Sequence, residues 1–576
     1  MSDAATLTAW SRLLLASLAE AGVSRVVISP GSRSTPFVLA AGQTPGLQID
    51  TIIDERSAAF FALGQARVSG APTLLLCTSG TAGAHYLPAV IEAAMARVPL
   101  LILTADRPPA LQGCDAPQTI DQRGLFGHFA RWSADLGLPD ASPGSLRALR
   151  RVAHQAAHTS RWPLAGPVHL NAPARKPLEP AFSRAERDLL RAVHALLAEP
   201  APAARPPQTR PSEAAVASLQ AALSGARRPL AVAGPAPLGP PAETLHQLAR
   251  LGVPVLVEST SQLRRGPDHG AARVGAFDPI LRDPSRREAL APDLVIQLGG
   301  PPTSGLYERW MSERPGLRRL VVRATGWSDP QSSAEILLAE PAELLAALQP
   351  GVEMEAGWPE AWREAEARAW RAVAGSAQDP AAELRFAAAA VSALPEGALL
   401  VLGNSLPIRD VDAALPPGGP AIGVLCQRGA NGIDGLVSGA AGAAAASGRP
   451  TLLLIGDVSL LHDVGGLAIA AEARGPLVIV VLNNRGGRIF EQLPVARSGA
   501  TEADMARFTT PHDRDLSHAA ALYGIIYSRV DSAEALSGAL LVALAHRRAT
   551  LIEARVTPDS YAAQIAQIQA ALAEGA

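Results

Sequence analysis

Lysine is almost missing from this 576-residue chain: Lys176 is the only lysine among 51 lysines and arginines. No Gly-Lys-Ser/Thr segment exists, so the chain has no P-loop for a nucleoside triphosphate. A Schiff-base enzyme would have to depend on Lys176, which lies in the loop-like segment Ala-Arg-Lys-Pro. The sequence therefore disfavours P-loop ATPases and pyridoxal enzymes.

Cysteine, excess charge and long apolar runs are also scarce. Cys77, Cys114 and Cys426 are scattered, with no Cys-x-x-Cys, which disfavours a disulfide framework or a zinc knuckle and fits a reducing cytosol. The net charge of −2 offers no basic surplus for nucleic-acid phosphates. No run approaches the ~18 apolar residues of a membrane span, and the N-terminus lacks the basic start of a signal peptide. We predict a cytoplasmic protein that binds no nucleic acid and has no membrane span.

The order of apolar and helical segments indicates an α/β fold. Short β-branched or Leu-rich runs alternate with Ala-rich stretches, as in parallel sheets covered by helices. The length is about four times the ~150 residues of a typical domain. We predict three doubly wound parallel-sheet domains. The predicted strands are 25–29, 47–53, 73–77, 100–104 and 167–170, then 230–233, 254–257, 293–298 and 319–323, then 399–402, 451–455, 477–482 and 550–554.

Proline marks the predicted domain boundaries. Five prolines between Pro200 and Pro211 stiffen and extend the chain, which is typical of an interdomain linker. We predict an N-terminal domain over 1–180, a Pro-rich linker over 181–210, a central α/β domain over 211–350 and a C-terminal domain over 351–576. A polar helix bearing three tryptophans is expected soon after Pro350.

Polar residues follow two neighbouring predicted strands of the C-terminal domain. Gly456-Asp457-Val458-Ser459 comes after 451–455, and Asn483-Asn484 comes after 477–482. Doubly wound sheets bind ligands at the carboxyl ends of strands. A carboxylate and an amide oxygen there suit Mg²⁺, and the turn at Gly486 leaves backbone carbonyls free to face it. Each segment alone could be a helix cap or a turn, but their pairing favours a metal site.

This spacing resembles the diphosphate-and-metal signature of thiamine diphosphate enzymes, with Val458 in place of a usual glycine. The resemblance implies that Asp457, Asn484 and the carbonyl of Gly486 bind Mg²⁺, with Mn²⁺ as an alternative. It implies cofactor contacts from Gly456, Asp457, Val458, Ser459 and Asn484.

Such enzymes also need a glutamate that hydrogen-bonds the aminopyrimidine ring and promotes proton removal from the thiazolium. Glu55, in Asp54-Glu55-Arg56 before the helical run 57–67, matches that position. Burial there would desolvate the carboxyl group and keep it protonatable. The local alternative is a first-turn acid favoured by the helix dipole.

Further motifs narrow the resemblance. They are Ser29-Pro-Gly-Ser-Arg-Ser-Thr-Pro36, Thr78-Ser-Gly-Thr-Ala82, Thr104-Ala-Asp-Arg-Pro-Pro109, Gln118, Gly403-Asn-Ser-Leu-Pro-Ile-Arg-Asp410, Arg428-Gly-Ala-Asn-Gly-Ile-Asp-Gly435, Leu461-His-Asp463, Gly487-Arg-Ile-Phe490 and Thr510-Pro-His512. Together they resemble the 2-succinyl-5-enolpyruvyl-6-hydroxy-3-cyclohexene-1-carboxylate synthase family. The resemblance implies domains of the thiamine diphosphate-dependent decarboxylase type, a pyrimidine-binding N-terminal domain and a diphosphate-binding C-terminal domain. It implies a menaquinone-biosynthesis transferase that decarboxylates 2-oxoglutarate and adds the succinyl unit to isochorismate.

The resemblance also implies residue roles. Both substrates are dianions, for which guanidinium forks are the expected partners. Ser405, Arg409 and Arg428 would hold the 2-oxoglutarate portion, and Ser32, Arg33, Arg107 and Gln118 would face isochorismate. Glu55, Arg33, Arg409 and Arg428 form the implied catalytic set. Ile433 would hold the cofactor bent, while Ile489, Phe490 and Leu493 would form an apolar wall around it. His462 and His512 are left outside the catalytic set.

One departure and several alternatives stay open. Relatives carry a lysine after Gly-x-x-Pro-x-Ser, where this chain has Gly305, and Arg264, Arg265 or Arg309 could compensate. The resemblance implies a homo-oligomer, a dimer or dimer of dimers, with sites at the subunit interface. Another 2-oxoacid decarboxylase, an acetohydroxyacid synthase, or a non-catalytic protein retaining the fold are the alternatives. The arginine motifs argue against the two enzymes, and intact Glu55, Asp457 and Asn484 argue against the third.

Overall fold

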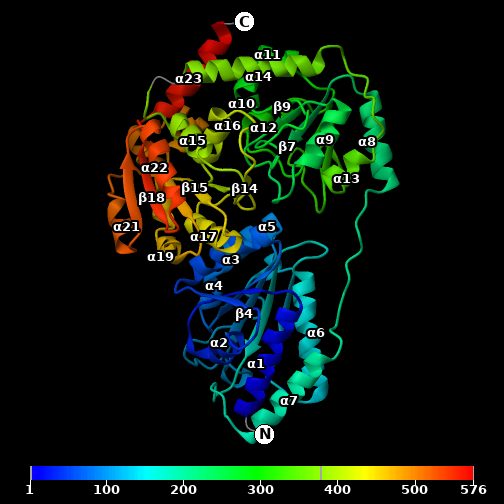
Figure 1. The fold of residues 1–576 in the computed structure, drawn as a ribbon, viewed down its shortest axis with the longest axis vertical. Coiled ribbons are helices and arrows are strands. Elements are labelled where there is room, and N and C mark those ends of the chain that lie inside the picture. Colours follow the sequence, from blue (N-terminus) through cyan, green and yellow to red (C-terminus); the bar gives the residue numbers. More distant parts are fainter. Residues whose placement is uncertain (1–2, 377–378, 575–576) are drawn as a thin grey trace. The chain divides into compact units, whose positions relative to one another are not determined.

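The computed structural model describes residues 3–376 and 379–574, which form three six-stranded parallel sheets. The described chain folds into two compact units. The first comprises Met1–Pro207, Gln427–Ser447 and Gly465–Ala470; the second comprises Gln208–Cys426, Gly448–Val464 and Ala471–Ala576. The first unit contains one sheet and the second unit contains two (Figure 1).

The first sheet has the strand order β2-β1-β3-β4-β6-β5. Its strands are β1 (Arg25–Ile28), β2 (Gln48–Thr51), β3 (Thr73–Cys77), β4 (Leu100–Asp106), β5 (Trp132–Asp135) and β6 (Pro167–Pro173). One face packs on α1 (Asp3–Glu20), α2 (Thr35–Gly42), α6 (Pro143–Thr159) and α7 (Arg184–Ala198). The other face is covered by α3 (Glu55–Ser69), α4 (Ala82–His85) and α5 (Leu87–Ala96), and α3 packs along α17 (Leu436–Ser447).

The second sheet has the order β12-β11-β10-β7-β8-β9, the arrangement of dinucleotide-binding folds. Its strands are β7 (Pro229–Ala233), β8 (Val255–Val257), β9 (Arg273–Val274), β10 (Leu294–Leu298), β11 (Arg318–Arg323) and β12 (Ala334–Leu338). Helices α8 (Glu213–Gly225), α9 (Ala242–Leu251) and α13 (Pro341–Ala346) cover one face. The other face packs on α10 (Phe277–Arg282), α12 (Gly305–Ser312) and α14 (Trp358–Gly375), with α11 (Pro284–Ala289) following α10.

The third sheet, β14-β13-β15-β16-β18-β17, repeats the order of the first. Its strands are β13 (Leu399–Leu402), β14 (Gly423–Cys426), β15 (Thr451–Gly456), β16 (Leu477–Asn483), β17 (Ile526–Val530) and β18 (Thr550–Arg555). Helices α15 (Glu383–Ser392), α16 (Leu406–Ala414) and α22 (Ala533–Ala545) cover one face. The remaining helices are α18 (Asp457–His462), α19 (Gly466–Glu472), α20 (Glu502–Thr509), α21 (Ser517–Leu522) and α23 (Ser560–Glu574).

Short 3₁₀ turns complete the structure: η1 (Ser32–Ser34), η2 (Pro109–Leu111), η3 (Gly127–Phe129), η4 (Arg488–Gln492) and η5 (Pro494–Arg497). Two of them, η1 and η4, follow the strands β1 and β16 directly and carry residues of the candidate site.

The three parallel sheets confirm the predicted fold class. Every predicted strand forms. Most of them are buried on both faces and therefore read as continuous apolar runs, whereas β2 is exposed or half-buried along its length. The strands β5, β9, β12, β14 and β17 were not predicted, and each lies at or next to the rim of its sheet. Strand β17 shows the reason: Ile-Tyr-Ser-Arg-Val is mostly exposed or half-buried, so it has no apolar run to read.

Helix α7 lies inside the predicted linker 181–210. Ser183 caps its N-terminus by accepting a hydrogen bond from Glu186 N–H, and Val193 and Leu196 join the core around α1. The stretch without helix or strand is therefore shorter and begins later, at residues 199–212. The tryptophan-bearing helix forms as predicted: α14 buries Trp358 and Trp362.

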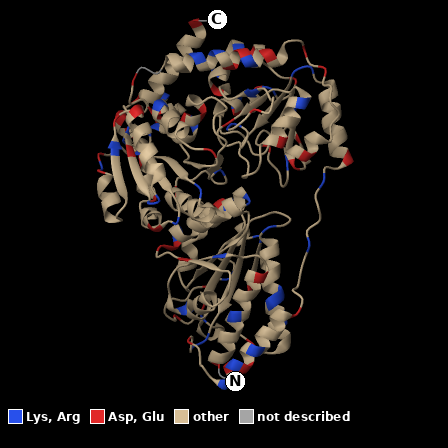
Figure 2. Cartoon of the chain, viewed as in Figure 1, with Lys and Arg blue, Asp and Glu red and all other residues tan. Residues whose placement is uncertain are grey.

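No helix of the described residues is long and apolar enough to cross a membrane. Acidic and basic side chains alternate along exposed helices such as α14, as Figure 2 shows. This mixture of signs agrees with the near-zero net charge.

Candidate functional site

Asp457 begins α18 at the carboxyl end of β15, and its side chain is buried. Oδ1 accepts a hydrogen bond from the N–H of Val458 and Oδ2 accepts one from the N–H of Gly486, both at 2.8 Å. Nε2 of His512 lies 3.2 Å from Oδ2. Burial raises the pKa of Asp457, and the hydrogen bonds from the backbone oppose that effect. The carboxylate is therefore fixed in orientation at the strand end.

Asn484 follows the neighbouring strand β16 and presents an unpaired oxygen. Its Nδ2 donates a hydrogen bond to Oε1 of Glu383 at 2.9 Å. Its Oδ1 is buried and has no hydrogen-bond partner among the described residues. Because the amide nitrogen is committed to Glu383, the oxygen points the other way. A buried amide oxygen without a donor is suited to a cation.

Gly486 completes the candidate metal site. Its φ is 147°, and a Cβ there would lie 2.5 Å from the carbonyl oxygen of Thr509, so the turn requires glycine. Its carbonyl accepts one hydrogen bond, from Arg488 N–H at 3.0 Å, and keeps a second lone pair. One carboxylate, one amide oxygen and one carbonyl fit Mg²⁺, which takes its other ligands from phosphate and water. The residues described contain no cluster of three or more His, Cys, Asp or Glu that could hold a metal.

Asp410 and Glu383 are among the other buried carboxyl groups of this unit. Neither oxygen of Asp410 has a hydrogen-bond partner among the described residues, and burial raises its pKa to about 8 against the influence of Arg409. Burial and the neighbouring Asp410 raise the pKa of Glu383 well above its usual range. Both groups therefore favour the protonated form in the protein alone.

Ser405 and Arg409 lie together at the start of α16. Ser405 has φ 75° and ψ −129°, a conformation that costs a non-glycine residue ~1–3 kcal/mol and is typical of functional sites. Nη1 of Arg409 donates a hydrogen bond to the Ser405 carbonyl at 2.6 Å. The guanidinium is half-buried, so it remains accessible to a small anion.

The predicted apolar wall lies on and just after η4, directly beyond Gly486 and Gly487. Ile489 and Phe490 are half-buried and Leu493 is 41% exposed. Phe490 packs against Phe508 with ring centroids 5.7 Å apart. These side chains give the segment an apolar surface that the protein itself leaves partly open.

In the first unit, three neighbouring strand ends bring two arginines together. Arg33 follows β1, Ser79 follows β3 and Arg107 follows β4. Nη1 of Arg107 donates to Oγ of Ser79 at 2.6 Å, and Nε2 of Gln118 donates to the Ser79 carbonyl at 3.0 Å. Exposed Ser32 lies beside Arg33 in η1. The structure thus gathers the residues that the sequence assigns to isochorismate.

Arg33 is 6% exposed and carries an unsatisfied donor. Nη1 donates to the Ala174 carbonyl at 2.8 Å, whereas Nε has no partner among the described residues. Burial and the positive charge of Arg107 lower the pKa of Arg33, and Asp106 opposes them. An anion bound beside two nearby positive charges offsets their mutual repulsion, so this strand end favours an acidic ligand.

Glu55 is the first residue of α3. The side chain of Asp54 caps the helix by accepting the Arg56 N–H at 2.9 Å. Glu55 itself is half-buried, whereas the sequence analysis expected burial. The desolvation needed for a proton relay is therefore incomplete in the protein alone.

Helices α3 and α17 pack closely along glycines. A Cβ on Gly435 would collide with the Phe60 ring, and one on Gly64 would lie 2.0 Å from the Gly439 carbonyl. A Cβ on Gly442 would likewise lie 2.0 Å from the Phe61 carbonyl oxygen, so glycines on both helices let the two backbones come into contact.

The loop 428–435 is anchored by a buried glutamate on α5. Glu92 accepts hydrogen bonds from the N–H groups of Gly429 at 3.0 Å and Ala430 at 2.6 Å, and it pairs with Arg67. A cavity of about 410 Å³ is lined by α5 and this loop. Arg428 and Ile433 are both half-buried, so their side chains are not part of a sealed core.

The position at which relatives carry the lysine has free space around it. Gly305 begins α12, and a Cβ there would meet nothing within 4 Å. Arg264 is fully buried and Arg265 is 7% exposed, while Arg309 is exposed on α12. Arg264 therefore cannot contact a substrate, which removes one of the three alternatives.

Sequence reasoning missed the residues that hold the motifs in place. Glu383 lies 101 residues before Asn484 and Glu92 lies 337 residues before Gly429, with no local motif around either. The motif Thr-Pro-His drew attention to His512, but nothing in the sequence indicated that it lies next to Asp457.

Comparisons with known proteins identify the family. The description "Thiamine pyrophosphate enzyme, N-terminal TPP binding domain" matches residues 9–125, and "Thiamine pyrophosphate enzyme, C-terminal TPP binding domain" matches residues 428–554. A benzoylformate decarboxylase from Polynucleobacter necessarius has the same fold, with TM-score 0.70 and 16% identity over 95% of this chain and 98% of that one.

Two curated relatives are named 2-succinyl-5-enolpyruvyl-6-hydroxy-3-cyclohexene-1-carboxylate synthase. The one from Sorangium cellulosum is 45% identical over 97% of this chain and 94% of its own length. The one from Myxococcus xanthus is 40% identical over 100% and 99%. This chain therefore belongs to the 2-succinyl-5-enolpyruvyl-6-hydroxy-3-cyclohexene-1-carboxylate synthase family of thiamine diphosphate-dependent enzymes.

Proposed function

We propose that this enzyme decarboxylates 2-oxoglutarate on thiamine diphosphate and adds the succinyl unit to isochorismate, in menaquinone biosynthesis. The observation that carries the proposal is the convergence of Arg33 and Arg107 at neighbouring strand ends, with an unsatisfied donor on Arg33. A dianionic second substrate satisfies those charges, whereas pyruvate carries one carboxylate.

The cofactor would be held by the second unit through Mg²⁺. Asp457, Asn484 and the Gly486 carbonyl would bind the metal, and the metal would bind the diphosphate. When bound, thiamine diphosphate supplies the carbon nucleophile that makes loss of CO₂ from a 2-oxoacid feasible. Ser405 and Arg409 would then hold a carboxylate of 2-oxoglutarate, and Ile489 and Phe490 would keep water from the reacting carbon.

Glu55 would exchange a proton with the aminopyrimidine ring. Its position as the first residue of α3, with a half-buried side chain, supports this role. The ring would cover the half-exposed carboxyl group and complete its desolvation. Arg428, held through its neighbours by Glu92, would contact the 2-oxoglutarate portion.

The assay measures 2-oxoglutarate consumption with thiamine diphosphate and Mg²⁺, with and without isochorismate. Strong acceleration by isochorismate, with formation of the succinylated cyclohexene, is the expected result. Consumption of pyruvate in preference to 2-oxoglutarate would instead assign a simple decarboxylase or an acetohydroxyacid synthase.

Replacement of Glu55 by Gln tests the proton relay. Turnover should fall by about 10²–10⁴-fold while cofactor affinity changes little. Glu213→Gln is the matched control, because Glu213 is also a first-turn acid, on α8, and is exposed. Near-normal turnover of Glu55→Gln would reduce Glu55 to a helix-dipole acid.

The proposed assembly is a homo-oligomer in which Glu55 of one subunit acts with Asp457 of another. Coexpression of Glu55→Gln with Asp457→Ala tests it. If sites form between subunits, about half of the dimers are mixed and each of these has one intact site of two, so the mixture recovers about a quarter of wild-type activity. If each site forms within one chain, the mixture stays as inactive as either variant alone.

A further inference from the structure

Arg264 is a fully buried arginine in the segment between β8 and β9, and it contacts α16, an element far along the chain. Nη1 donates to the carbonyls of Val257 at 2.9 Å and Gly275 at 3.2 Å and to Oδ1 of Asp412 at 3.2 Å. Nη2 donates to the carbonyls of Asp412 at 2.9 Å, Val411 at 3.5 Å and Leu415. One guanidinium therefore joins the second sheet to the end of α16.

Two of these acceptors, the carbonyls of Val411 and Asp412, lie in the last turn of α16, and the third belongs to its C-cap residue Leu415. The final carbonyls of a helix have no donor within the helix, and the helix dipole makes that end negative. The positively charged fork of Arg264 satisfies both requirements. Arg264 thus acts as a C-terminal cap supplied by another sheet.

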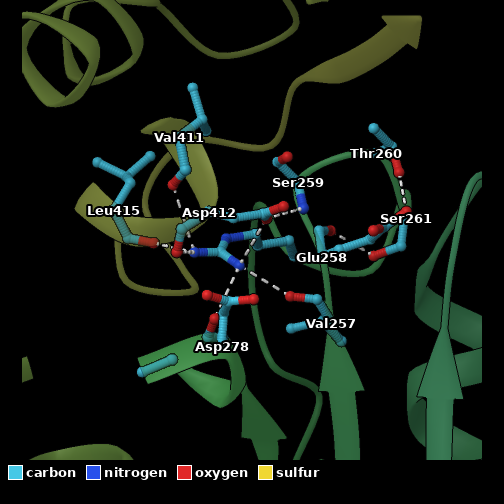
Figure 3. A network of polar contacts seen from close by, with 12 residues as sticks. Val257, Glu258, Ser259, Thr260, Ser261, Asp278, Val411, Asp412 and Leu415 are labelled. Carbon is cyan, nitrogen blue, oxygen red and sulfur yellow. Dashed lines mark hydrogen bonds and ion pairs between the residues drawn. The ribbon is translucent and has the colours of Figure 1, made fainter. Parts of the chain in front are cut away.

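A second residue of the same segment reinforces this cap. The N–H of Ser259 donates to Oδ1 of Asp412 at 2.6 Å, and its Oγ donates to the Ile408 carbonyl at 3.3 Å. Figure 3 shows Ser259 and Asp412 side by side, with Val411 and Leu415 on the same helix end. The segment from Ser259 to Arg264 therefore holds α16 by side-chain and backbone contacts.

The held helix carries the proposed substrate arginine. Arg409 and Asp412 are three residues apart, so they lie on one side of α16, about 4.5 Å apart along its axis. At the other end, Arg409 bonds back to Ser405, whose backbone is strained at φ 75°. A helix with a strained start keeps its position only if the rest of the structure holds it.

We propose that Arg264 is a positioning residue that, through Asp412 and the last carbonyls of α16, holds Arg409 where it binds a carboxylate of the 2-oxoacid. This inference rests on the proposed role of Arg409. The central sheet then contributes to substrate affinity without contacting the substrate. Stability alone explains the arrangement poorly, since apolar residues of similar volume often replace buried ion pairs at no cost.

The test compares two buried arginines of the second unit, Arg264 and Arg319. Arg264→Lys keeps the charge but removes the fork. Arg319→Lys is the matched control: Arg319 pairs with Asp329 at 3.1 Å, with exposures of 1% and 2%, and its other partners are Gln331 and Ser333.

We expect Arg264→Lys to raise KM for 2-oxoglutarate about tenfold, with the Kd for thiamine diphosphate and Mg²⁺ within about twofold of wild type. Arg319→Lys should lower Tm and leave KM unchanged. Asp412→Asn, which keeps the acceptor for Ser259, should also raise KM for 2-oxoglutarate. This variant replaces Arg264→Lys in the test if Arg264→Lys does not fold.

Three results would overturn the inference. The first is an unchanged KM in folded Arg264→Lys and Asp412→Asn. The second is a rise in KM for Arg319→Lys equal to that of Arg264→Lys, and the third is a loss of cofactor affinity in Arg264→Lys as large as its rise in KM. Arg409→Lys separates this inference from the proposed function. If Arg409→Lys raises KM but Arg264→Lys does not, only the positioning role fails; if Arg409→Lys changes nothing, the proposed role of Arg409 fails.

Discussion

Glu383 should control metal affinity although it is not itself a ligand. It is buried, and Oε1 accepts the Nδ2–H of Asn484 at 2.9 Å, which leaves Oδ1 of that amide facing away and unpaired. Glu383→Leu keeps a similar volume and removes the acceptor. The amide then gains freedom to turn its nitrogen toward the cation. Loss of a partner that orients a metal ligand typically lowers metal affinity by about 10- to 100-fold, and the buried Nδ2–H left without an acceptor costs about 1–3 kcal/mol.

The assay is a Mg²⁺ titration of the protein at saturating thiamine diphosphate, followed by calorimetry or intrinsic fluorescence. Glu553→Leu is the matched control, because Glu553 is equally buried and accepts the Nδ2–H of the adjacent Asn483 at 2.8 Å. Its loss should lower stability and leave Mg²⁺ affinity nearly unchanged. The reasoning is refuted if Glu383→Leu binds Mg²⁺ within twofold of wild type, or if both variants lose affinity equally.

Four further predictions concern single side chains. Glu92→Gln should lower the free energy of unfolding by about 3 kcal/mol in urea titrations, because Arg67 loses its buried partner; a loss below ~1 kcal/mol would contradict the anchor. Buried His169 has its pKa lowered to about 4 by desolvation, so the unfolded chain takes up a proton first as pH falls from about 6.5, and stability drops by about 1.4 kcal/mol per pH unit down to about 4. His169→Gln lacks this contribution, so the difference in stability between wild type and the variant should change with that slope between about pH 6.5 and about 4; an identical pH dependence in both proteins would refute it. Gly486→Ala should weaken Mg²⁺ and cofactor binding at least tenfold, because alanine must take φ 147° with its Cβ 2.5 Å from a carbonyl oxygen; normal binding would show that the turn can relax. Gly305→Lys should fold normally, since its Cβ meets no atom within 4 Å, and should lower KM for isochorismate but not for 2-oxoglutarate; unchanged kinetics would mean that another cation already serves.

The parts of the fold that could be predicted are those with an unambiguous burial pattern. Strand β16 is buried along its whole length, so it is apolar throughout and visible as 477–482. Strand β5, with alternate residues exposed, reads Trp-Ser-Ala-Asp and resembles a loop. Helix α7 was hidden for another reason: the proline cluster that follows it extended the apparent linker over its residues.

The residues of the candidate site likewise divide into those that the sequence pattern marks and those that it does not. Asp457 and Asn484 could be found because the ligand edge of a parallel sheet lies at strand ends, which the sequence marks by a polar residue after an apolar run. Their partners could not be found. Glu383 begins an Ala-rich helix, where a first-turn glutamate is ordinary, and only the folded chain brings it to Asn484.

The same limit explains why motif residues alone do not fix substrate preference. Asn484 is oriented by Glu383, the loop of Arg428 is anchored by Glu92, and the helix of Arg409 is capped by Arg264. Each holding residue lies outside the motifs it serves, so substitutions there can move a binding group while every motif stays intact. A relative can therefore share all the motifs and still differ in affinity for either substrate. Conversely, the loss of a motif cation, as at Gly305, can be offset by a change in how the remaining arginines are held.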